Sequence, residues 1–326
     1  MTPGKFRHLL RASTAAGHFV ILALDHRANL LEALNRHAPQ PLNDAAFTHF
    51  KQTLLHTLAP HASAILADPA YGIGPGIAGR ALPPHAGLLS AIEITDYDLR
   101  PSARAVRFIP GWSVGKIKRV GGDGVKLLLA FHPEDADADV RRAAVRRLID
   151  ACGSADIPLY LEPIPYSLDE SQPLSSVELT HLTVAIAREF SQMGADVLKL
   201  QFPADDESDE QTWMRACEAV THACGDTPWA LLSGGVPFDT FARQAQIACR
   251  SGACGIIAGR AVWNEAVALA GKARVEFLAT TGVERLEKLA QICADDAVPI
   301  FERVRMAEPE PLWYEHYDDL CPSTNH

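Results

Sequence analysis

Eight short apolar segments recur along the chain, and a longer amphipathic stretch separates each segment from the next. The segments span residues 19–25, 63–68, 87–93, 123–131, 157–163, 196–202, 228–233 and 254–259. Several are continuously apolar, as in FVILALD and AILAD, which is typical of parallel strands covered on both faces. This alternation restricts the fold more than any other feature, and it predicts eight parallel β-strands.

The stretches between these segments have the apolar spacing of helices. Asn43 can cap a helix that ends near Leu58, with Phe47, Phe50 and Leu54 on one face. Similar spacing predicts helices over residues 136–152, 177–193, 207–223 and 238–252, and a shorter one over 112–120. Several of them end in glycine just before the next segment, as a helix C-cap does.

Strands that alternate with helices indicate a parallel sheet, and a count of eight favours an α/β fold of the closed (β/α)8 type, a TIM barrel, over an open doubly wound sheet. No Gly-x-Gly-x-x-Gly fingerprint follows the first segment, so a dinucleotide site is not expected. We expect a single domain over residues 1–326, with the barrel at about 10–270 and C-terminal helices and a tail at 271–326. The helical pattern of 274–306 breaks near 281–282, and the tail begins at 308.

Charge and composition exclude several classes of function. The formal net charge is −10, so a basic surface for nucleic acid or anionic lipid is not expected. No apolar run reaches the ~18 residues that span a bilayer, and no signal peptide is recognisable, so we expect a cytoplasmic protein without a membrane partner. The seven cysteines form no Cys-x-x-Cys pair and are expected to act as small hydrophobes in a reducing compartment. Many barrels self-associate, which is the only ground for expecting a homo-oligomer.

Charged and polar residues lie at the ends of the apolar segments, where the active site of a (β/α)8 barrel forms. They are Asp25, Asp68, Glu93, Lys126, Glu162, Lys199, Ser233, Gly259 and Arg260. Burying a charge costs several kcal/mol unless the charge is paired. Their presence in apolar segments therefore requires a functional or structural reason.

Side-chain alternation along three of the strands places Lys126, Glu162 and Lys199 on the face that points into the barrel. Burial and a neighbouring positive charge both favour the neutral amine of a lysine, which can attack a carbonyl group. A carboxylate within reach can move the protons of such a reaction. The alternative is a plain buried ion pair in which Glu162 neutralises either lysine. The residues alone leave both interpretations open.

Two adjacent loops are rich in glycine: Ser233-Gly234-Gly235 follows the seventh segment, and Gly259-Arg260 follows the eighth. Small residues let backbone N–H groups approach a phosphate, and the loops after the last two strands form the common phosphate site of such barrels. The alternative is a pair of tight turns that need glycine for positive φ. Two glycine-rich loops together with an arginine favour phosphate binding.

The first segment ends in Asp25-His26-Arg27. Asp25 can bind a substrate hydroxyl or tune the lysines, and Arg27 can hold a second anionic group. Alternatively, Asp25 caps the following helix and Arg27 forms a salt bridge. Asp68 is expected to anchor its loop. The thirteen histidines have no metal-ligand spacing, so neither a metal nor another cofactor is expected.

Seven segments, in chain order, resemble the tagatose 1,6-bisphosphate aldolase family and its relatives, the sulfofructose 1-phosphate aldolases: ILALDHR, AILADPAYG, GVKLLL, PLYLEP, DVLKLQFP, LLSGGV and AGRAVW. The likeness extends from about residue 10 to residue 305. It implies a class I aldolase on a (β/α)8 barrel, in which Lys199 forms a Schiff base with the C2 carbonyl of a ketose. It also implies that Glu162 is the acid/base carboxylate and Lys126 a second active-site lysine.

The same resemblance matches Asp25 to an aspartate of the family and assigns the C1 phosphate to a pocket formed by Ser233, Gly234, Gly259 and Arg260. Two positions depart from the family pattern, because Gln201 stands where a glutamate is expected and His26 where a glutamine is expected. These departures leave the type of reaction unchanged and leave the exact substrate open.

The expected reaction is reversible cleavage of a ketose 1-phosphate, such as tagatose 1,6-bisphosphate, to dihydroxyacetone phosphate and an aldehyde. A sulfofructose 1-phosphate aldolase and a related transaldolase are alternatives that use the same chemistry. A barrel that binds a sugar phosphate and regulates a partner without turnover is an alternative of a different class. The set of Lys126, Glu162 and Lys199 argues against that alternative, and the absence of metal-ligand spacing argues against a metal-dependent aldolase.

Overall fold

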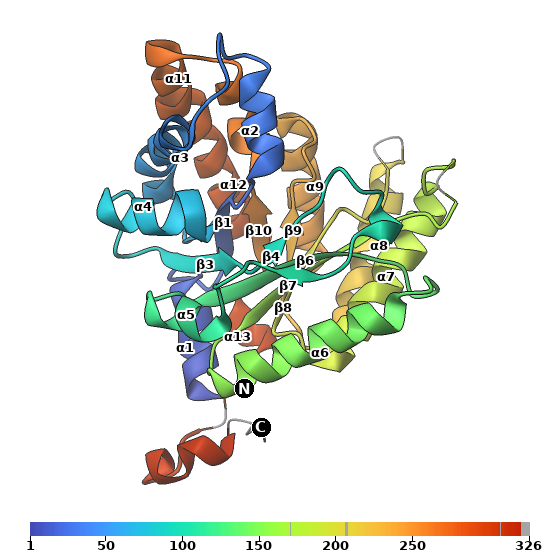
Figure 1. Ribbon diagram of the computed structural model, residues 1–326. Helices are drawn as coiled ribbons and strands as arrows, with labels where there is room; N and C mark the ends of the chain where they lie inside the picture. The colour runs from blue at the N-terminus through green and yellow to red at the C-terminus, as the bar shows by residue number, and fades with distance from the viewer. Residues whose placement is uncertain (170, 206–207, 307, 321–326) are drawn as a thin grey trace.

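Eight parallel strands close into a barrel in the computed structural model, which describes residues 1–169, 171–205, 208–306 and 308–320 (Figure 1). Around the barrel the strands follow one another in chain order, and the last pairs with the first. They are β1 (Phe19–Leu24), β2 (Ala64–Ala67), β3 (Gly87–Ala91), β6 (Gly124–Phe131), β7 (Leu159–Pro165), β8 (Val197–Leu200), β9 (Trp229–Leu232) and β10 (Gly255–Ala258). Each of the eight apolar segments contributes one strand, and the prediction of a (β/α)8 barrel is confirmed.

Closure of the barrel depends on close backbone contact between β1 and β10. Phe19 lies opposite Gly255 in the register of these two strands. Gly255 has φ +133°, and a Cβ atom added there would lie 2.0 Å from the carbonyl oxygen of Phe19. Only glycine fits this position, because both its backbone angle and the available space exclude a side chain.

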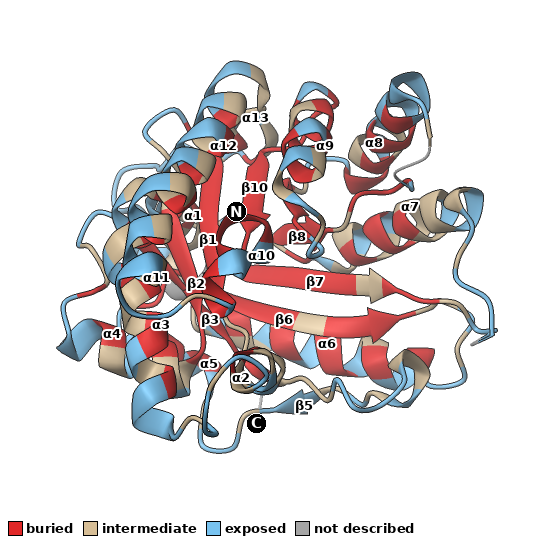
Figure 2. Ribbon diagram, turned by 90° about the horizontal axis from the view of Figure 1, so that it is seen from above, coloured by how far each residue is buried: buried red, intermediate tan, exposed pale blue. Residues whose placement is uncertain are grey.

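The side chains of each strand alternate between the barrel interior and the surrounding helices. Phe19, Leu66 and Tyr160 belong to the interior cluster, where the rings of Phe19 and Tyr160 pack edge to face at 5.9 Å. Neighbouring positions such as Val20 and Leu161 pack under the helices instead. Figure 2 shows the barrel strands buried almost throughout, with exposed residues confined to the outer helices and loops. The segments are therefore continuously apolar because both faces of each strand are buried, one in the barrel interior and the other under the helices.

In the part of the chain that the structure describes, helices lie in each of the stretches where the sequence predicts them. The helices are α1 (Pro3–Arg11), α2 (Ala28–Asn35), α3 (Asp44–Leu58), α4 (Gly74–Ala78), α5 (Val114–Arg119), α6 (Ala138–Ser154), α7 (Ser176–Met193), α8 (Glu210–Cys224), α9 (Phe238–Arg250), α10 (Arg260–Trp263), α11 (Gly271–Phe277), α12 (Val283–Asp296) and α13 (Ile300–Arg303). Four of these described helices, α1, α2, α4 and α10, were not predicted. Asn43 caps α3, since its side chain accepts a hydrogen bond from the Ala46 N–H. Gly194, with φ +102°, ends α7 just before β8.

Two expected helix boundaries differ in the structure. The helix predicted over 207–223 begins at Glu210, because the side chain of Asp209 accepts a hydrogen bond from the Thr212 N–H and caps it there; residue 207 lies outside the described residues. The break expected near 281–282 is a π-helical turn over Leu278–Gly282, and it leads from α11 into α12. Among the described residues, no helix combines the length and apolar character needed to cross a bilayer.

The N-terminal end of the barrel is covered by α1 and by residues 300–304, since Leu9, Ile300 and Val304 belong to the interior cluster. Arg11 and His8 of α1 both contact the carboxylate of Asp123 at the start of β6, at 2.8 and 3.0 Å. In the tail, Trp313–Leu320 forms a 3-10 helix, and the Tyr317 hydroxyl donates a hydrogen bond to Asp156. The described part of the predicted tail therefore contacts the barrel, while residues 321–326 lie outside the described residues (Figure 1).

A short antiparallel pair, β4 (Glu93–Ile94) and β5 (Arg107–Phe108), lies between β3 and β6 and was not predicted. Each of its strands has two residues, which is too short for any periodicity to indicate. The segment between them projects at the C-terminal end of the barrel, and β5 is exposed (Figure 2).

Asp68 anchors its loop, as expected, and it does so through a partner that the sequence did not indicate. Its carboxylate accepts hydrogen bonds from the Ala70 and Tyr71 N–H groups and forms a fully buried ion pair with Lys51 of α3. Lys51 also donates to the carbonyl oxygen of Leu24 at the end of β1. Burial lowers the pKa of Lys51, although Asp68 opposes this effect. One lysine thus ties the ends of β1 and β2 to α3.

We predict that Lys51→Met lowers the free energy of unfolding by about 3–5 kcal/mol, because it leaves the Asp68 carboxylate buried without its counter-charge. Urea unfolding followed by circular dichroism measures the effect. The double variant Lys51→Met/Asp68→Asn should be more stable than Lys51→Met alone, and Lys116→Met, which removes an exposed lysine of α5, serves as the control. A Lys51→Met protein as stable as the control would contradict the prediction.

Candidate active site

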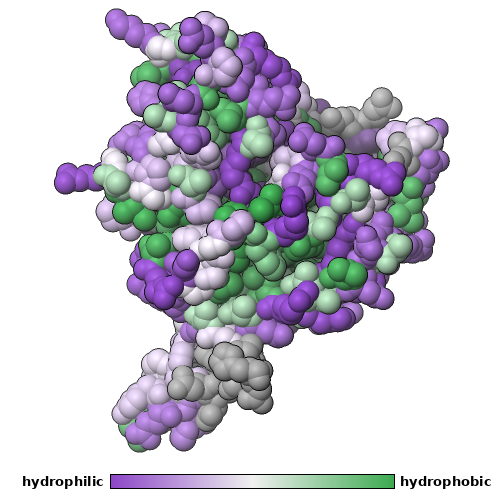
Figure 3. All heavy atoms as spheres, viewed as in Figure 1, coloured by the Kyte–Doolittle hydropathy of each residue, from purple (hydrophilic) through white to green (hydrophobic). Residues whose placement is uncertain are grey.

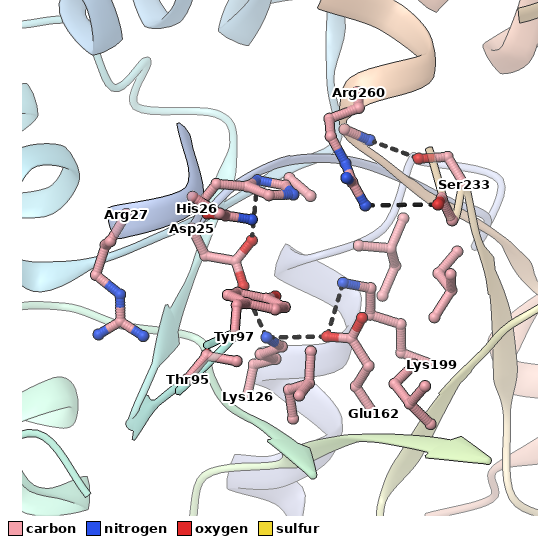
Figure 4. Close-up of a pocket in the computed structure, with 18 of the residues that line it drawn as sticks. Asp25, His26, Arg27, Thr95, Tyr97, Lys126, Glu162, Lys199, Ser233 and Arg260 are labelled. Carbon is pink, nitrogen blue, oxygen red and sulfur yellow. Dashed lines mark hydrogen bonds and ion pairs between the residues drawn. The ribbon is translucent and has the colours of Figure 1, made fainter. Parts of the chain in front are cut away.

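A cavity of about 390 Å3 opens at the C-terminal ends of the barrel strands (Figure 4). It contains most of the polar residues that the sequence singled out. Its polar and charged lining residues are Asp25, His26, Arg27, Asn29, Thr95, Tyr97, Arg104, Lys126, Glu162, Lys199, Gln201, Ser233 and Arg260, and Gly234 and Gly259 also line it. Asp68 is absent from this lining, in accordance with its role in the loop after β2.

Lys126 lies at the centre of a buried group of carboxylates. Its Nζ donates hydrogen bonds to Asp25 Oδ2 at 2.7 Å and to Glu93 Oε1 at 2.9 Å, and it lies 2.9 Å from Glu162 Oε2. Burial opposes the charge of this lysine, but the three carboxylates outweigh burial and raise the pKa of Lys126 well above its ordinary value. Lys126 is therefore an ammonium group at any physiological pH.

Lys199 enters the cavity from β8 and has a different environment. Its Nζ lies 2.9 Å from Glu162 Oε2, the same oxygen atom that faces Lys126. Both contacts have the distance of an ion pair, yet neither is aligned as a hydrogen bond to Glu162 Oε2. The Oε2 atom of Glu162 thus lies between the Nζ atoms of Lys126 and Lys199 but accepts a well-aligned hydrogen bond from neither (Figure 4).

Asp25 does not cap the following helix. Helix α2 begins at Ala28, and its N-terminus has no side-chain cap. Asp25 instead contacts Lys126, and although burial alone would raise its pKa, the charges of Lys126 and Lys199 hold the pKa of Asp25 well below its ordinary value. The capping alternative is wrong for Asp25, because the side chain turns into the barrel.

Arg27 lines the cavity but points away from the two lysines (Figure 4). Its guanidinium group donates a hydrogen bond to the backbone carbonyl of Glu93. The structure thus gives Arg27 a backbone acceptor where one interpretation expected a salt bridge, and the binding of a second anionic group by Arg27 remains a prediction.

The two glycine-rich loops meet beside Arg260. The Ser233 hydroxyl accepts a hydrogen bond from the Gly259 N–H at 3.3 Å, and the Arg260 guanidinium lies 3.5 Å from the Gly234 carbonyl oxygen (Figure 4). Gly234 and Gly235 both have positive φ, so the tight-turn interpretation is correct, and phosphate binding by these loops remains a prediction. Gly235 does not line the cavity, and a Cβ atom there would lie 3.1 Å from Arg260 Cζ. The geometry thus makes Gly235 a packing neighbour of Arg260.

His26 adjoins these loops and was noticed in the sequence only as a departure from a family pattern. Its Nδ1 lies 3.8 Å from Asp25 Oδ1 and is buried with no hydrogen-bond partner among the described residues, and its ring packs edge to face on Trp263. Burial, assisted by the charges of Arg260 and Lys199, lowers the pKa of His26 to about 4, against the attraction of Asp25. The imidazole is therefore neutral at pH 7.

Three lining residues come from the arm between β4 and β5 and were missed by the sequence reasoning: Thr95, Tyr97 and Arg104. The arm has no apolar periodicity, so no local signal directs these side chains toward the cavity. Arg104 lies over the ring of Tyr97, with its Cζ atom 5.4 Å from the ring centroid. Within the described part of the chain, no group of three or more His, Cys, Asp or Glu side chains is arranged to hold a metal ion.

Comparison with known sequences gives consistent matches over most of the chain. The sequence profile of the DeoC/LacD family aldolases matches residues 19–265. A tagatose 1,6-diphosphate aldolase of Listeria monocytogenes is 32% identical, over 95% of this chain and 99% of that protein. Tagatose 1,6-diphosphate aldolase 2 of Enterococcus faecalis is 31% identical, over 94% of this chain and 99% of that protein.

Solved structures with the same fold are more distant in sequence. The fructose-bisphosphate aldolase from Plasmodium falciparum matches with a TM-score of 0.69 at 11% identity, over 90% of this chain and 95% of that chain. A Schiff-base-forming fructose-1,6-bisphosphate aldolase matches with a TM-score of 0.61 at 17% identity, over 88% of this chain and 98% of that chain. At these identities the likeness establishes the fold.

The lowered pKa of His26 predicts a stability difference between pH 7 and pH 4. The pKa of a histidine is near 6.5 in the unfolded chain, whereas the pKa of His26 is about 4 in the folded protein. The contribution of neutral His26 to the free energy of unfolding is therefore present above pH 6.5 and is lost as the pH falls toward 4. The loss amounts to at most about 3 kcal/mol.

Urea unfolding of the wild type and of His26→Gln at both pH values measures this loss as a difference between the two proteins. His26→Gln should lose less stability on acidification. His37→Gln, which replaces an exposed histidine, should behave as the wild type does. Equal losses in the wild type and His26→Gln would show that His26 titrates normally.

Proposed function

The chain belongs to the DeoC/LacD family of aldolases, which are carbon–carbon lyases, and we propose that it is a class I aldolase that cleaves a ketose 1-phosphate through a Schiff base on Lys199. The observation that carries this proposal is the unequal environment of the two buried lysines. The names of the curated relatives favour tagatose 1,6-bisphosphate as the substrate.

Lys199 is the better nucleophile because Lys126 cannot release its proton at physiological pH. Lys126 faces three carboxylates, which raise its pKa well above the ordinary value. An ammonium group has no lone pair with which to attack a carbonyl carbon. Among the described residues, Lys199 forms an ion pair with Glu162 only, through the oxygen atom Oε2 that Lys126 also attracts. The side chain of Lys199 lines the cavity where a substrate carbonyl would lie.

The reaction follows from these positions. The neutral amine of Lys199 adds to C2 of the ketose, and loss of water from the carbinolamine leaves an iminium group. A base removes the proton of the C4 hydroxyl, the C3–C4 bond breaks, and its electron pair passes to the iminium nitrogen. An aldehyde leaves, the enamine takes a proton at C3, and water releases dihydroxyacetone phosphate from Lys199.

Glu162 is the group best placed to move these protons. One of its oxygens lies 2.9 Å from the nitrogen atoms of both lysines. A carboxylate so close to the reacting amine can accept the proton of the carbinolamine step and return it. Lys126 stays charged beside it, so Glu162 exchanges protons next to a fixed positive charge. Asp25, ionised at neutral pH, holds Lys126 and can accept a hydrogen bond from a substrate hydroxyl.

The C1 phosphate fits the end of the cavity formed by Ser233, Gly234, Gly259 and Arg260. Arg260 supplies a guanidinium group beside two loops that have little side-chain bulk, an arrangement suited to a phosphate dianion. Arg27 and Arg104 line the cavity as well, and we propose that they attract a second anionic group at the distal end of the ketose.

A sulfofructose 1-phosphate aldolase or a transaldolase would use the same lysine and carboxylates. The cavity holds Gln201 and neutral His26 where the family pattern has glutamate and glutamine, and these two differences are the reason to test both distal groups. A barrel that binds sugar phosphates without turnover has no need of the paired lysines, so their geometry favours an enzyme.

We predict that borohydride reduction in the presence of the correct ketose phosphate attaches the substrate to Lys199 and leaves Lys126 unmodified. The panel comprises tagatose 1,6-bisphosphate, fructose 1,6-bisphosphate and sulfofructose 1-phosphate, and peptide mass spectrometry locates the adduct. Lys199→Arg, which keeps the charge without a nucleophile, should lower kcat at least about a thousandfold. Lys272→Ala, at an exposed lysine, is the control. An adduct on Lys126, or full activity of Lys199→Arg, would refute the assignment.

Arg260→Met should raise KM for the ketose 1-phosphate about tenfold or more, because a charge-assisted bond to phosphate is lost. The change in kcat should be smaller, since the reacting carbon lies at the lysines. Steady-state kinetics of aldehyde release measures both constants. Arg36→Met removes an exposed arginine outside the cavity and should leave KM unchanged. An unchanged KM in Arg260→Met would place the phosphate elsewhere.

A further inference from the structure

Glu93 is a buried carboxylate that the proposed reaction does not use. It is 2% exposed and does not line the cavity. One oxygen, Oε1, accepts a hydrogen bond from Lys126 at 2.9 Å, and the other, Oε2, is buried with no hydrogen-bond partner in the described protein. Asp25 and Glu162 already lie beside the same ammonium group, and Glu162 also faces Lys199. A third buried carboxylate is costly unless it has a task of its own.

The backbone of Glu93 belongs to a second structure, the arm of residues 93–108. Glu93 is the first residue of β4 and pairs with Phe108 of β5, so it forms the base of the arm. Its carbonyl oxygen accepts a hydrogen bond from Arg27. Just outside the base, the Ile109 N–H bonds to the Ile92 carbonyl oxygen at 2.9 Å. The residue that binds the catalytic-site lysine through its side chain therefore also closes the arm through its backbone.

The arm brings Tyr97 and Arg104 to the cavity and keeps its own shape by internal contacts. Arg104 donates hydrogen bonds to the carbonyl oxygens of Leu99 and Tyr97, and Arg107 pairs with Asp96. These contacts fix residues of the arm relative to one another but not relative to the barrel. The antiparallel base is only two residues long on each side, and such a short pair is not stable by itself.

Besides the hydrogen bond from Arg27 to the Glu93 carbonyl oxygen, side-chain contacts tie the arm to the barrel at separate places. Glu93 contacts Lys126 of β6 at the base. Arg141 of α6 donates a hydrogen bond to the carbonyl oxygen of Ser102, at 2.6 Å, nearer the tip. The first contact joins two charges in a buried setting, so it contributes more than a neutral hydrogen bond does. It also joins the arm to the ion-pair group that contains Glu162.

We propose that Glu93 is a positioning residue that couples Lys126 to the arm. Its carboxylate holds the ammonium group in place against Glu162, and its backbone holds the base of the arm, so that Tyr97 and Arg104 stay over the cavity. The consequence for catalysis rests on the proposed function, whereas the coupling itself does not. Loss of the Glu93 side chain loosens the arm and lets Lys126 turn away from Glu162.

Limited trypsin digestion of the native protein tests the coupling without any substrate. The arm offers cleavage after Arg104 and after Arg107, while Pro101 protects the bond after Arg100. In Glu93→Ala both arm sites should be cut about tenfold faster, as one lost buried charge pair predicts. Glu93→Gln should lie between Glu93→Ala and the wild type, because the amide oxygen still accepts a neutral hydrogen bond. Cleavage after exposed Arg80 is the internal control and should not change.

A double-variant comparison separates coupling from a general loss of stability. Lys126→Met should speed arm cleavage as Glu93→Ala does, and the double variant should be no faster than either single variant, since both remove the same contact. In the double variant Glu93→Ala/Arg141→Met, the increase in the rate of arm cleavage should equal the product of the increases in the two single variants. The proposal would be overturned if trypsin cut the arm of Glu93→Ala at the wild-type rate. It would also be overturned if the rate increases of Glu93→Ala and Lys126→Met multiplied in their double variant. If Lys126→Met does not fold, the proposal is tested by the rates of arm cleavage at position 93 alone, which should decrease from Glu93→Ala to Glu93→Gln to the wild type.

Steady-state kinetics gives a readout that a purely structural role would not produce. Glu93→Gln keeps much of the arm contact but removes the charge beside Lys126, so kcat should fall about tenfold with KM within about twofold of the wild type. Glu93→Ala should lower kcat and raise KM together. A Glu93→Gln enzyme with wild-type kcat would overturn the catalytic part. If the wild type cleaves no ketose phosphate at all, the proposed function fails, and the trypsin comparison still decides whether Glu93 couples Lys126 to the arm.

Discussion

The geometry of the site depends on one buried ammonium group surrounded by three carboxylates. Lys126 of β6 attracts Asp25 from the end of β1, Glu93 from β4 and Glu162 from β7, all at 2.7–2.9 Å. Three regions that are far apart in the sequence thus share one cation. Any one of these charges alone would be expensive to bury, and removal of Lys126 would take the counter-charge from Asp25 and Glu93 and leave Glu162 with Lys199. The four side chains therefore stabilise one another, because each buried charge is compensated by the opposite charges around it.

This group also gives the two lysines different electrostatic surroundings although the residue type is the same. Both side chains are buried and both point into the barrel, as alternation along their strands requires. The number of carboxylates around each nitrogen separates them, with three beside Lys126 and one beside Lys199. The three carboxylates hold the pKa of Lys126 well above its ordinary value, whereas Lys199 shares one carboxylate and lines the cavity. This difference in surroundings supports the proposed division of roles, in which Lys126 stays charged and Lys199 is the nucleophile.

Features carried by regular strands could be predicted from the sequence, whereas features that depend on contacts between distant segments could not. Lys126 and Lys199 were expected to face inward because the strand period of two determines the face of each side chain. Lys51 lies on a helix and Asp68 follows the end of a strand, and neither segment contains a local pattern that predicts the ion pair between them. Gly235 belonged to a glycine-rich loop, but its distance from the cavity depends on where Arg260 lies. The two-residue strands at Glu93 and Arg107 are too short for any pattern.

The division between strands and loops also explains why reaction type is easier to infer than substrate. Lys126, Glu162 and Lys199 are carried by β6, β7 and β8, whose register is fixed by barrel closure. Tyr97 and Arg104 are carried by the arm, where length and sequence can change without disturbing the barrel. A residue such as Glu93, which belongs to both parts, limits that freedom, because a change in the arm that moves its base also moves Lys126.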